Sequence, residues 1–293
     1  MSHLDVGRFD RWLLAPGSAR RLAILRILVA GYATSFVVLR WPSFWNGASL
    51  GERQLEGVGV LWWLTSRPDP NLMHALLIIT VCVGVLVTLG VRHRVTGPVF
   101  AILFLVVTTY RLSFGHVIHT EHLVAVHLLV VGFSRSGDAL TPHRSPPSPD
   151  RDVYGWPVKV MACATVAAYT LAGWAKIDHG GLDWLVGDVL RNQVAYDNLR
   201  KVLLGSDHSV IGAHIIGYRW IFPPFAVLTV AVELLAFVTL LGRPRLIVAW
   251  VFAAWAFHVA VLATMAIAYP YQLTAIAYAP LLPVEHIFRR RHR

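Results

Sequence analysis

The sequence predicts an all-α fold, a polytopic integral membrane bundle of about eight transmembrane helices with both termini in the cytoplasm. Composition is the first reason, because 56% of the 293 residues are hydrophobic and 14% are charged, whereas soluble domains contain about 25% charged residues. The second reason is that apolar residues gather in runs close to the roughly 20 residues that a helix needs to cross a bilayer. The third is the placement of basic residues between these runs, which sets the orientation.

Eight apolar segments carry this prediction. Residues 1–20, which precede the first, are polar and lack the apolar core of a signal peptide, so we expect a cytoplasmic N-terminal segment. The fourth and eighth segments are short and can be tilted or partly interfacial, which leaves the count open by about one. The segments are Arg21 to Trp41, Asn71 to Val91, Val95 to Leu112, His119 to Phe133, Trp156 to Ile177, Arg219 to Leu241, Leu246 to Ile267 and Tyr271 to Pro283.

Basic residues collect on one side of this map, and the other side holds few of them outside its longest loop. They cluster at both ends of the chain and after the second, fourth and sixth segments, which is typical of cytoplasmic loops. Residues 144–152, rich in Pro and Ser, then form a cytoplasmic linker, and residues 178–218 form an extracytoplasmic loop that contains an interfacial helix over Gly181 to Leu204. The net charge of +10 thus reflects topology, and we expect the lipid bilayer as a partner and no nucleic acid. Residues 1–293 are expected to form one domain.

Lys176, at the end of the fifth segment, is the first candidate for chemistry. Helical spacing places Tyr169, Gly173 and Lys176 on one face, and the glycine leaves room for another backbone or a ligand. Lys176 can simply extend its amine to the outer interface. However, the chain has only three lysines among its 26 Lys and Arg residues, and a desolvated lysine, unlike an arginine, can lose its proton and act as a base.

Histidines form the second group of candidates. His116, His119 and His122 recur every third residue at the mouth of the fourth segment. On an α-helix this spacing drifts by about 60° per step, so the three imidazoles cannot all face one ion without a ligand from elsewhere in the chain, and we expect no metal site. The cluster can also relay protons or cap the helix. His127 faces away from His122 and is expected to be a packed, hydrogen-bonded histidine.

Two further ionisable residues lie in the middle of apolar segments, where each costs about 2.5–3.5 kcal/mol on insertion. Glu233 is expected to be a structural buried carboxyl paired with Arg26, His127 or His258. His258 can be structural or functional. Its segment leads into a turn that carries Tyr271 and Gln272 at the outer face, and such non-helical backbone is tolerated only beside protein or water. Together with Lys176 and His122, these residues favour a pocket that opens outward and into the bilayer.

The sequence resembles the horizontally transferred transmembrane domain family, whose best-known member is the vitamin K-dependent gamma-carboxylase. The resemblance rests on short motifs that occur in order along nearly the whole chain. They are Leu25-Arg26-Ile27, Leu89 to Val95, the region of His122, Ala172 to Asp178 with Asp183-Trp184 and Gly187, Glu233 ahead of Gly242, and Phe257-His258 leading to Tyr271.

This resemblance implies roles for three catalytic candidates. Lys176 matches the lysine that deprotonates reduced vitamin K, His122 matches a histidine of the quinone site, and His258 matches a histidine of a later span. The implied cofactor is a vitamin K-like quinol such as menaquinol, with oxygen and carbon dioxide as possible co-substrates. Tyr169, Gly173, Tyr271 and Gln272 are the cofactor-binding candidates. The family's large lumenal region has no counterpart here, so carboxylation of a protein is not implied.

Three functions are therefore in competition. The first is an enzyme of the bacterial cell (inner) membrane that binds a lipid quinone on the extracytoplasmic side and modifies a small molecule or a secreted peptide with oxygen. The second is a non-catalytic membrane partner for the maturation of, or immunity to, a secreted peptide. The third is a transporter, which is disfavoured because no internal repeat is detectable and few charges lie in the middle of the membrane.

Overall fold

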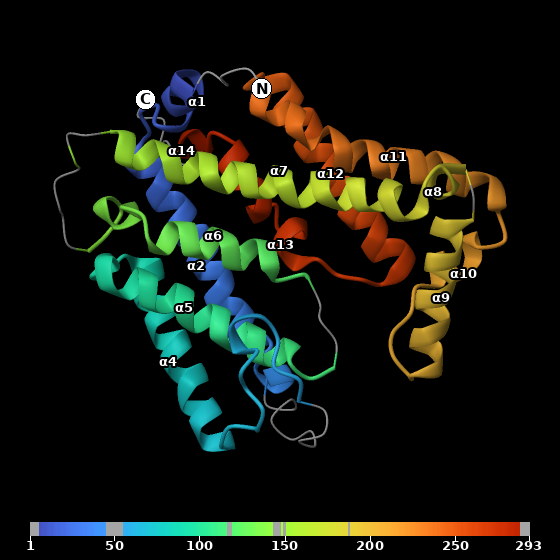
Figure 1. The fold of residues 1–293 in the computed structure, drawn as a ribbon, viewed down its shortest axis with the longest axis horizontal. Helices are drawn as coiled ribbons and strands as arrows, with labels where there is room; N and C mark the ends of the chain where they lie inside the picture. Colours follow the sequence, from blue (N-terminus) through green and yellow to red (C-terminus); the bar gives the residue numbers. More distant parts are fainter. Residues whose placement is uncertain are drawn as a thin grey trace. The chain divides into compact units, whose positions relative to one another are not determined.

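The computed structural model describes residues 6–44, 55–115, 119–142, 148, 151–186 and 188–287 (Figure 1). All regular elements within these ranges are α-helices or short 3-10 helices. Among the described residues, six helical segments are long and apolar enough to cross a membrane, which confirms the prediction of a multi-pass helical membrane protein. They are α2 (Ala19–Leu39), α4 (Pro70–Leu89), α5 (His93–Leu112), α7 (Asp152–Gly180), the segment Arg219–Leu241 and α12 (Pro244–Met265).

The two short predicted segments differ from these six. The predicted span from His119 to Phe133 contains helix α6 (His122–Gly132), which has 11 residues. The predicted span from Tyr271 to Pro283 is divided into α13 (Pro270–Leu273) and the 3-10 helix η6 (Ile276–Leu281) by Ala275, whose φ is +61°. A left-handed residue breaks the helical hydrogen-bond ladder. Eight spans, and the side on which the termini lie, therefore remain predictions.

The described chain divides into two compact units, and the single domain expected from the sequence stays a prediction. Unit 1 consists of Met1–Met161 and Pro283–Arg293, and unit 2 of Ala162–Leu282. The boundary falls inside α7 and not at the linker over residues 144–152, whose described positions are 148, 151 and 152.

Unit 1 is built around α2, which packs against α4 and α6, while α5 packs against α4 and α6. Helix α4 begins at Pro70 behind an Asp69 cap and ends at Gly90, whose φ is +78°. Such a conformation favours glycine, and a Cβ at Gly90 would lie 2.8 Å from the guanidinium carbon of the buried Arg26. The shorter elements of this unit are α1 (Val6–Leu13), η2 (Gly59–Leu61), η3 (Ser136–Asp138) and α14 (Val284–Ile287).

Unit 2 contains the C-terminal part of α7 and the elements that follow it. The segment Arg219–Leu241 consists of η4 (Arg219–Ile221), α11 (Phe222–Leu234) and η5 (Leu235–Leu241). The predicted helix over Gly181 to Leu204 is instead two helices, α8 (Asp183–Val186) and α9 (Val189–Leu203), and α10 (Val210–Ile215) follows. Trp184 of α8 is 5% exposed and packs with Ala226 and Val230 of α11, which holds the loop after α7 against the bundle.

Candidate functional site

A largely buried ion pair joins α7 to α11 in unit 2. The Lys176 Nζ atom lies 2.5 Å from each carboxylate oxygen of Glu233. The side chains are 23% and 5% exposed, respectively. The ammonium also lies 5.4 Å from the centroid of the Trp184 ring, within the range of a cation–π interaction. Lys176 is therefore directed into the unit, against a carboxylate and an aromatic ring, and not into bulk solvent.

Gly173 explains why the two helices come this close. A Cβ at Gly173 would lie 2.9 Å from the Cβ of Glu233 and 3.0 Å from the backbone nitrogen of Leu234. Only a glycine accommodates this approach without displacement. The space that the sequence analysis assigned to another backbone or a ligand is therefore filled by α11, which runs beside the C-terminal part of α7 (Figure 1).

Tyr169, about one turn before Gly173 on α7, is the centre of a buried network of phenol and imidazole groups. Its hydroxyl lies 2.7 Å from His258 Nε2 on α12 and 2.7 Å from the Tyr278 hydroxyl on η6. All three side chains are at most 6% exposed. The Tyr269 ring lies 4.9 Å from the His258 ring. Trp250 packs edge-on against Tyr169 at 5.0 Å.

Electrostatic interactions connect this network to the ion pair. The Glu233 carboxylate interacts with the phenols of both Tyr169 and Tyr269. The pKa of Tyr269 is raised above its ordinary value, first because the phenol is buried and then because Glu233 and Asp197 lie near it. We call this group the α7 polar cluster; its members are Lys176, Glu233, Tyr169, His258, Tyr278 and Tyr269.

Tyr271 and Gln272 are buried on α13, at 0% and 8% exposure. The Gln272 Oε1 atom is buried and accepts no hydrogen bond from the part of the chain that the structure describes. A buried carbonyl oxygen of this kind is costly unless a donor reaches it. Gln272 is therefore a candidate acceptor for a ligand hydroxyl.

The remaining candidates lie in unit 1. His122 is an exposed residue at the first position of α6, whereas the α7 polar cluster is built from unit 2 alone. His127 is fully buried, and its Nε2 lies 3.0 Å from the Met161 carbonyl oxygen. His116 lies outside the described residues, and within those ranges no group of three His, Cys, Asp or Glu side chains is placed to hold a metal ion.

The partner of Glu233 corrects the sequence analysis, which offered Arg26, His127 or His258. Arg26 instead donates to the backbone carbonyls of Ser136, Ala139 and Leu140, at 2.6, 3.1 and 2.7 Å. These carbonyls lie in η3 and directly after it, and a guanidinium offers enough N–H groups for all three. Arg26 therefore stabilises a loop of unit 1, while Lys176 of unit 2 pairs with Glu233.

Four aromatic members and neighbours of the cluster were not named as site candidates from the sequence, although Trp184 is part of one motif of the family resemblance: Tyr269, Tyr278, Trp184 and Trp250. Tyrosine and tryptophan are common at the ends of membrane helices, so their presence there is not a functional signal. Only the fold shows that Tyr278 is fully buried against Tyr169. As a group, the cluster can hold a proton at several neighbouring atoms in a largely dry environment.

Comparison of the sequence with protein-family models gives no match, and comparisons with curated proteins and with solved structures give none either.

Proposed function

We propose that this protein is a membrane enzyme that binds a reduced lipid quinone at the α7 polar cluster. It uses Lys176 as the base for an oxygen-dependent modification of a small molecule or peptide. In this proposal α6 and the α13 to η6 segment complete eight spans, both termini are cytoplasmic, and the cluster faces the extracytoplasmic side of the cell membrane. The observation that carries the proposal is the Lys176–Glu233 pair, held against Trp184 beside a buried phenol and imidazole network.

The residues present fit a flat, apolar ligand with hydroxyl groups. The buried indole rings of Trp184 and Trp250 pack beside Lys176 and Tyr169 and give the cluster apolar walls, and the Gln272 Oε1 atom is a buried acceptor that lacks a donor from the described residues. Lys176 keeps 23% of its side chain exposed, so the proposed ligand would approach the ion pair from the surface of unit 2. A reduced quinone supplies two ionisable hydroxyls and the reducing equivalents for a reaction with oxygen.

Glu233 gives Lys176 a route to the neutral form that a base requires. Separated charges are costly in a medium of low dielectric constant. When an apolar ligand excludes water from the pair, one proton can pass from Lys176 Nζ to a Glu233 carboxylate oxygen, which leaves both groups neutral. The amine then accepts a proton from a ligand hydroxyl, and the original proton stays on Glu233. His258 and Tyr169, fixed by their mutual hydrogen bond, are preorganised to stabilise negative charge nearby.

The lipid content of the purified protein tests this proposal. Wild-type protein purified in a mild detergent should retain menaquinone, or a related quinone, at close to one molecule per chain. Glu233→Gln and Lys176→Ala should retain less, whereas His179→Ala should behave as wild type, because His179 is on the same helix with its side chain 81% exposed. Wild-type protein that carries no quinone, and takes up none when it is added, would contradict the proposal.

A second candidate function is a non-catalytic membrane partner for the maturation of, or immunity to, a secreted peptide. The observation that favours it is an exposed apolar surface on α9 and α10, where Tyr196, Leu203 and Val210 are 69%, 76% and 75% exposed. Surfaces of this kind often contact a protein or a membrane. This candidate predicts co-purification with a small secreted peptide that Tyr196→Ser and Leu203→Ser weaken and that Lys176→Ala leaves unchanged.

A further inference from the structure

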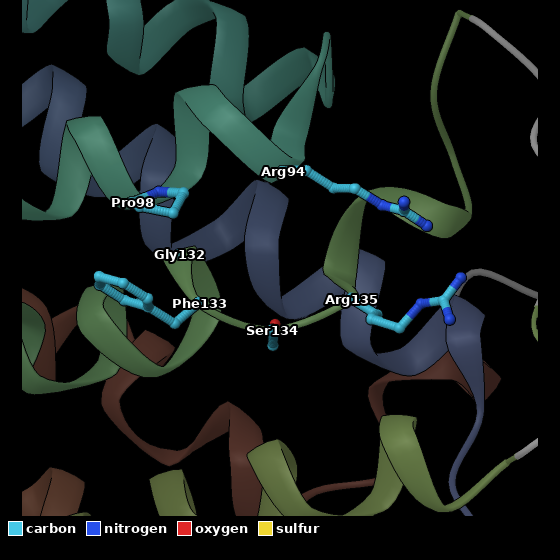
Figure 2. A pocket seen from close by; sticks show the side chains of 6 residues that line it. All are labelled: Arg94, Pro98, Gly132, Phe133, Ser134 and Arg135. Atoms are coloured by element: carbon cyan, nitrogen blue, oxygen red, sulfur yellow. The ribbon is translucent and has the colours of Figure 1, made fainter.

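Unit 1 carries a surface pocket of about 440 Å³ at the start of α5 and the end of α6 (Figure 2). None of its lining residues belongs to the α7 polar cluster. Its lining residues are Arg94, Pro98, Gly132, Phe133, Ser134 and Arg135.

The pocket has a cationic end and an apolar end. Figure 2 shows the side chains of Arg94 and Arg135 extending toward the same side, while Pro98 and Phe133 lie together at the other. Arg94 is exposed. Arg135 uses its Nε to bind Asp138 at 2.8 Å, and its terminal guanidinium nitrogens are further donors. Phe133 is 59% exposed, so the apolar end is open to a ligand.

The backbone beneath the pocket is tightly packed. A Cβ at Gly97 would lie 2.5 Å from the Gly132 carbonyl oxygen, and a Cβ at Gly132 would lie 2.7 Å from that of Gly97. Helices α5 and α6 are therefore in direct backbone contact here. The buried His93 binds Ser136 at 2.8 Å and the Val131 carbonyl at 3.1 Å. These contacts fix the turn that carries Phe133 and Arg135, so the pocket is preformed.

The pocket places its cationic groups and its apolar groups in the same order, along the membrane normal, as the phosphate and the acyl chains of a phospholipid. Arg94 is the second residue of the membrane-spanning helix α5, and Pro98 lies about 6 Å further along it, at about 1.5 Å per residue. The cationic end thus falls at headgroup depth and the apolar end at the depth of the upper acyl chain. The planar guanidinium group of an arginine can donate two parallel hydrogen bonds to the oxygens of one phosphate.

We propose that this pocket binds an anionic phospholipid, with its phosphate between Arg94 and Arg135 and its upper acyl chain along Pro98 and Phe133. The lipid fastens the start of α5 to the end of α6. A free phosphate would satisfy the two arginines but would leave the apolar end, with its exposed phenylalanine, uncovered.

Native mass spectrometry of the purified protein in a neutral detergent tests this proposal. The probes are phosphatidylglycerol, phosphatidylcholine and inorganic phosphate, each added at the same concentration. Wild-type protein should retain one phosphatidylglycerol at least about tenfold more than the Arg94→Gln/Arg135→Gln double variant, since each basic residue near an anionic surface contributes about 1 kcal/mol. Arg245→Gln should bind as wild type, because this exposed arginine lies at the start of α12 in unit 2.

Two further variants keep the test decisive if the double variant folds poorly. Arg94→Lys keeps the positive charge but loses the two-pronged guanidinium, so it should retain an intermediate amount of lipid. Phe133→Ser should weaken the retention of lipid without creating a phosphate site. Gel filtration of each variant verifies the fold. Equal retention of phosphatidylglycerol by the wild type and a folded double variant would overturn the proposal. So would equal retention of phosphatidylcholine, or displacement of the lipid by inorganic phosphate at equal concentration.

Discussion

Lys176 Nζ lies 2.5 Å from both carboxylate oxygens of Glu233, across a contact between α7 and α11 that Gly173 makes possible. Both residues stand out in the sequence as charges in apolar segments, and the fold makes each the partner of the other. Three of the four predictions below depend on this pair.

Glu233→Gln should destabilise the protein and impair any activity. It removes the countercharge and leaves a largely buried ammonium, and breaking a fully buried pair costs about 3–5 kcal/mol. We expect a smaller loss here, because Lys176 is 23% exposed and solvent screens its charge. Unfolding in detergent by increasing denaturant measures the change. Adding Lys176→Met should recover part of the stability, as a double-mutant cycle reports, and a Glu233→Gln protein as stable as wild type would show that the pair contributes nothing.

Gly173→Ala should weaken the same pair without changing a charge. The added methyl group would lie 2.9 Å from the Cβ of Glu233, so the two helices must move apart, and overpacking of this kind typically costs about 1–3 kcal/mol. Gly31→Ala is the matched control, because a Cβ there meets only Thr88, at 3.7 Å. The midpoint temperature of thermal unfolding should be lower for Gly173→Ala than for wild type, and it should be unchanged or higher for Gly31→Ala. Equal midpoints would mean that α7 and α11 are not in close contact.

Tyr169→Phe should leave His258 and Tyr278 without the hydroxyl that joins them. Leaving buried polar groups unsatisfied costs about 1–3 kcal/mol, and the loss of a positioned donor should also slow catalysis. Tyr196→Phe is the control, since that side chain is 69% exposed. Denaturant midpoints and reaction rates measured together separate the two effects. If Tyr169→Phe matched wild type in both denaturant midpoint and reaction rate, the phenol and imidazole network would contribute to neither stability nor catalysis.

The sequence predicted the all-helical membrane fold, whereas its count of eight spans stays a prediction. Long apolar runs such as Pro70–Leu89 need no tertiary context to be recognised, because their length and composition match a bilayer. The short segments could not be resolved in this way. Whether residues 119–121 continue α6 or form a turn, and whether Ala275 adopts a left-handed conformation, depends on packing that periodicity does not report.

The candidate site was predicted in part. Lys176, Glu233, Tyr169 and His258 were singled out, three of them because ionisable groups in apolar segments need a partner or a purpose. Their pairing was not predicted, because Lys176 and Glu233 are 57 positions apart and no spacing rule links two different helices. Tyr278 carried no signal in the sequence, because only its burial distinguishes it from a tyrosine at the membrane interface. The role of His122 rests on the family resemblance and stays a prediction.

Oxygen uptake by purified protein supplied with menaquinol tests most directly whether Lys176 is a base. We predict that wild type and His179→Ala consume oxygen at the same rate. Lys176→Ala and Lys176→Arg should be slower by about 100-fold or more, the usual contribution of a general base, while remaining folded by gel filtration. Uptake by both Lys176 variants at the wild-type rate would contradict the catalytic role, and so would wild-type protein that holds menaquinol without consuming oxygen.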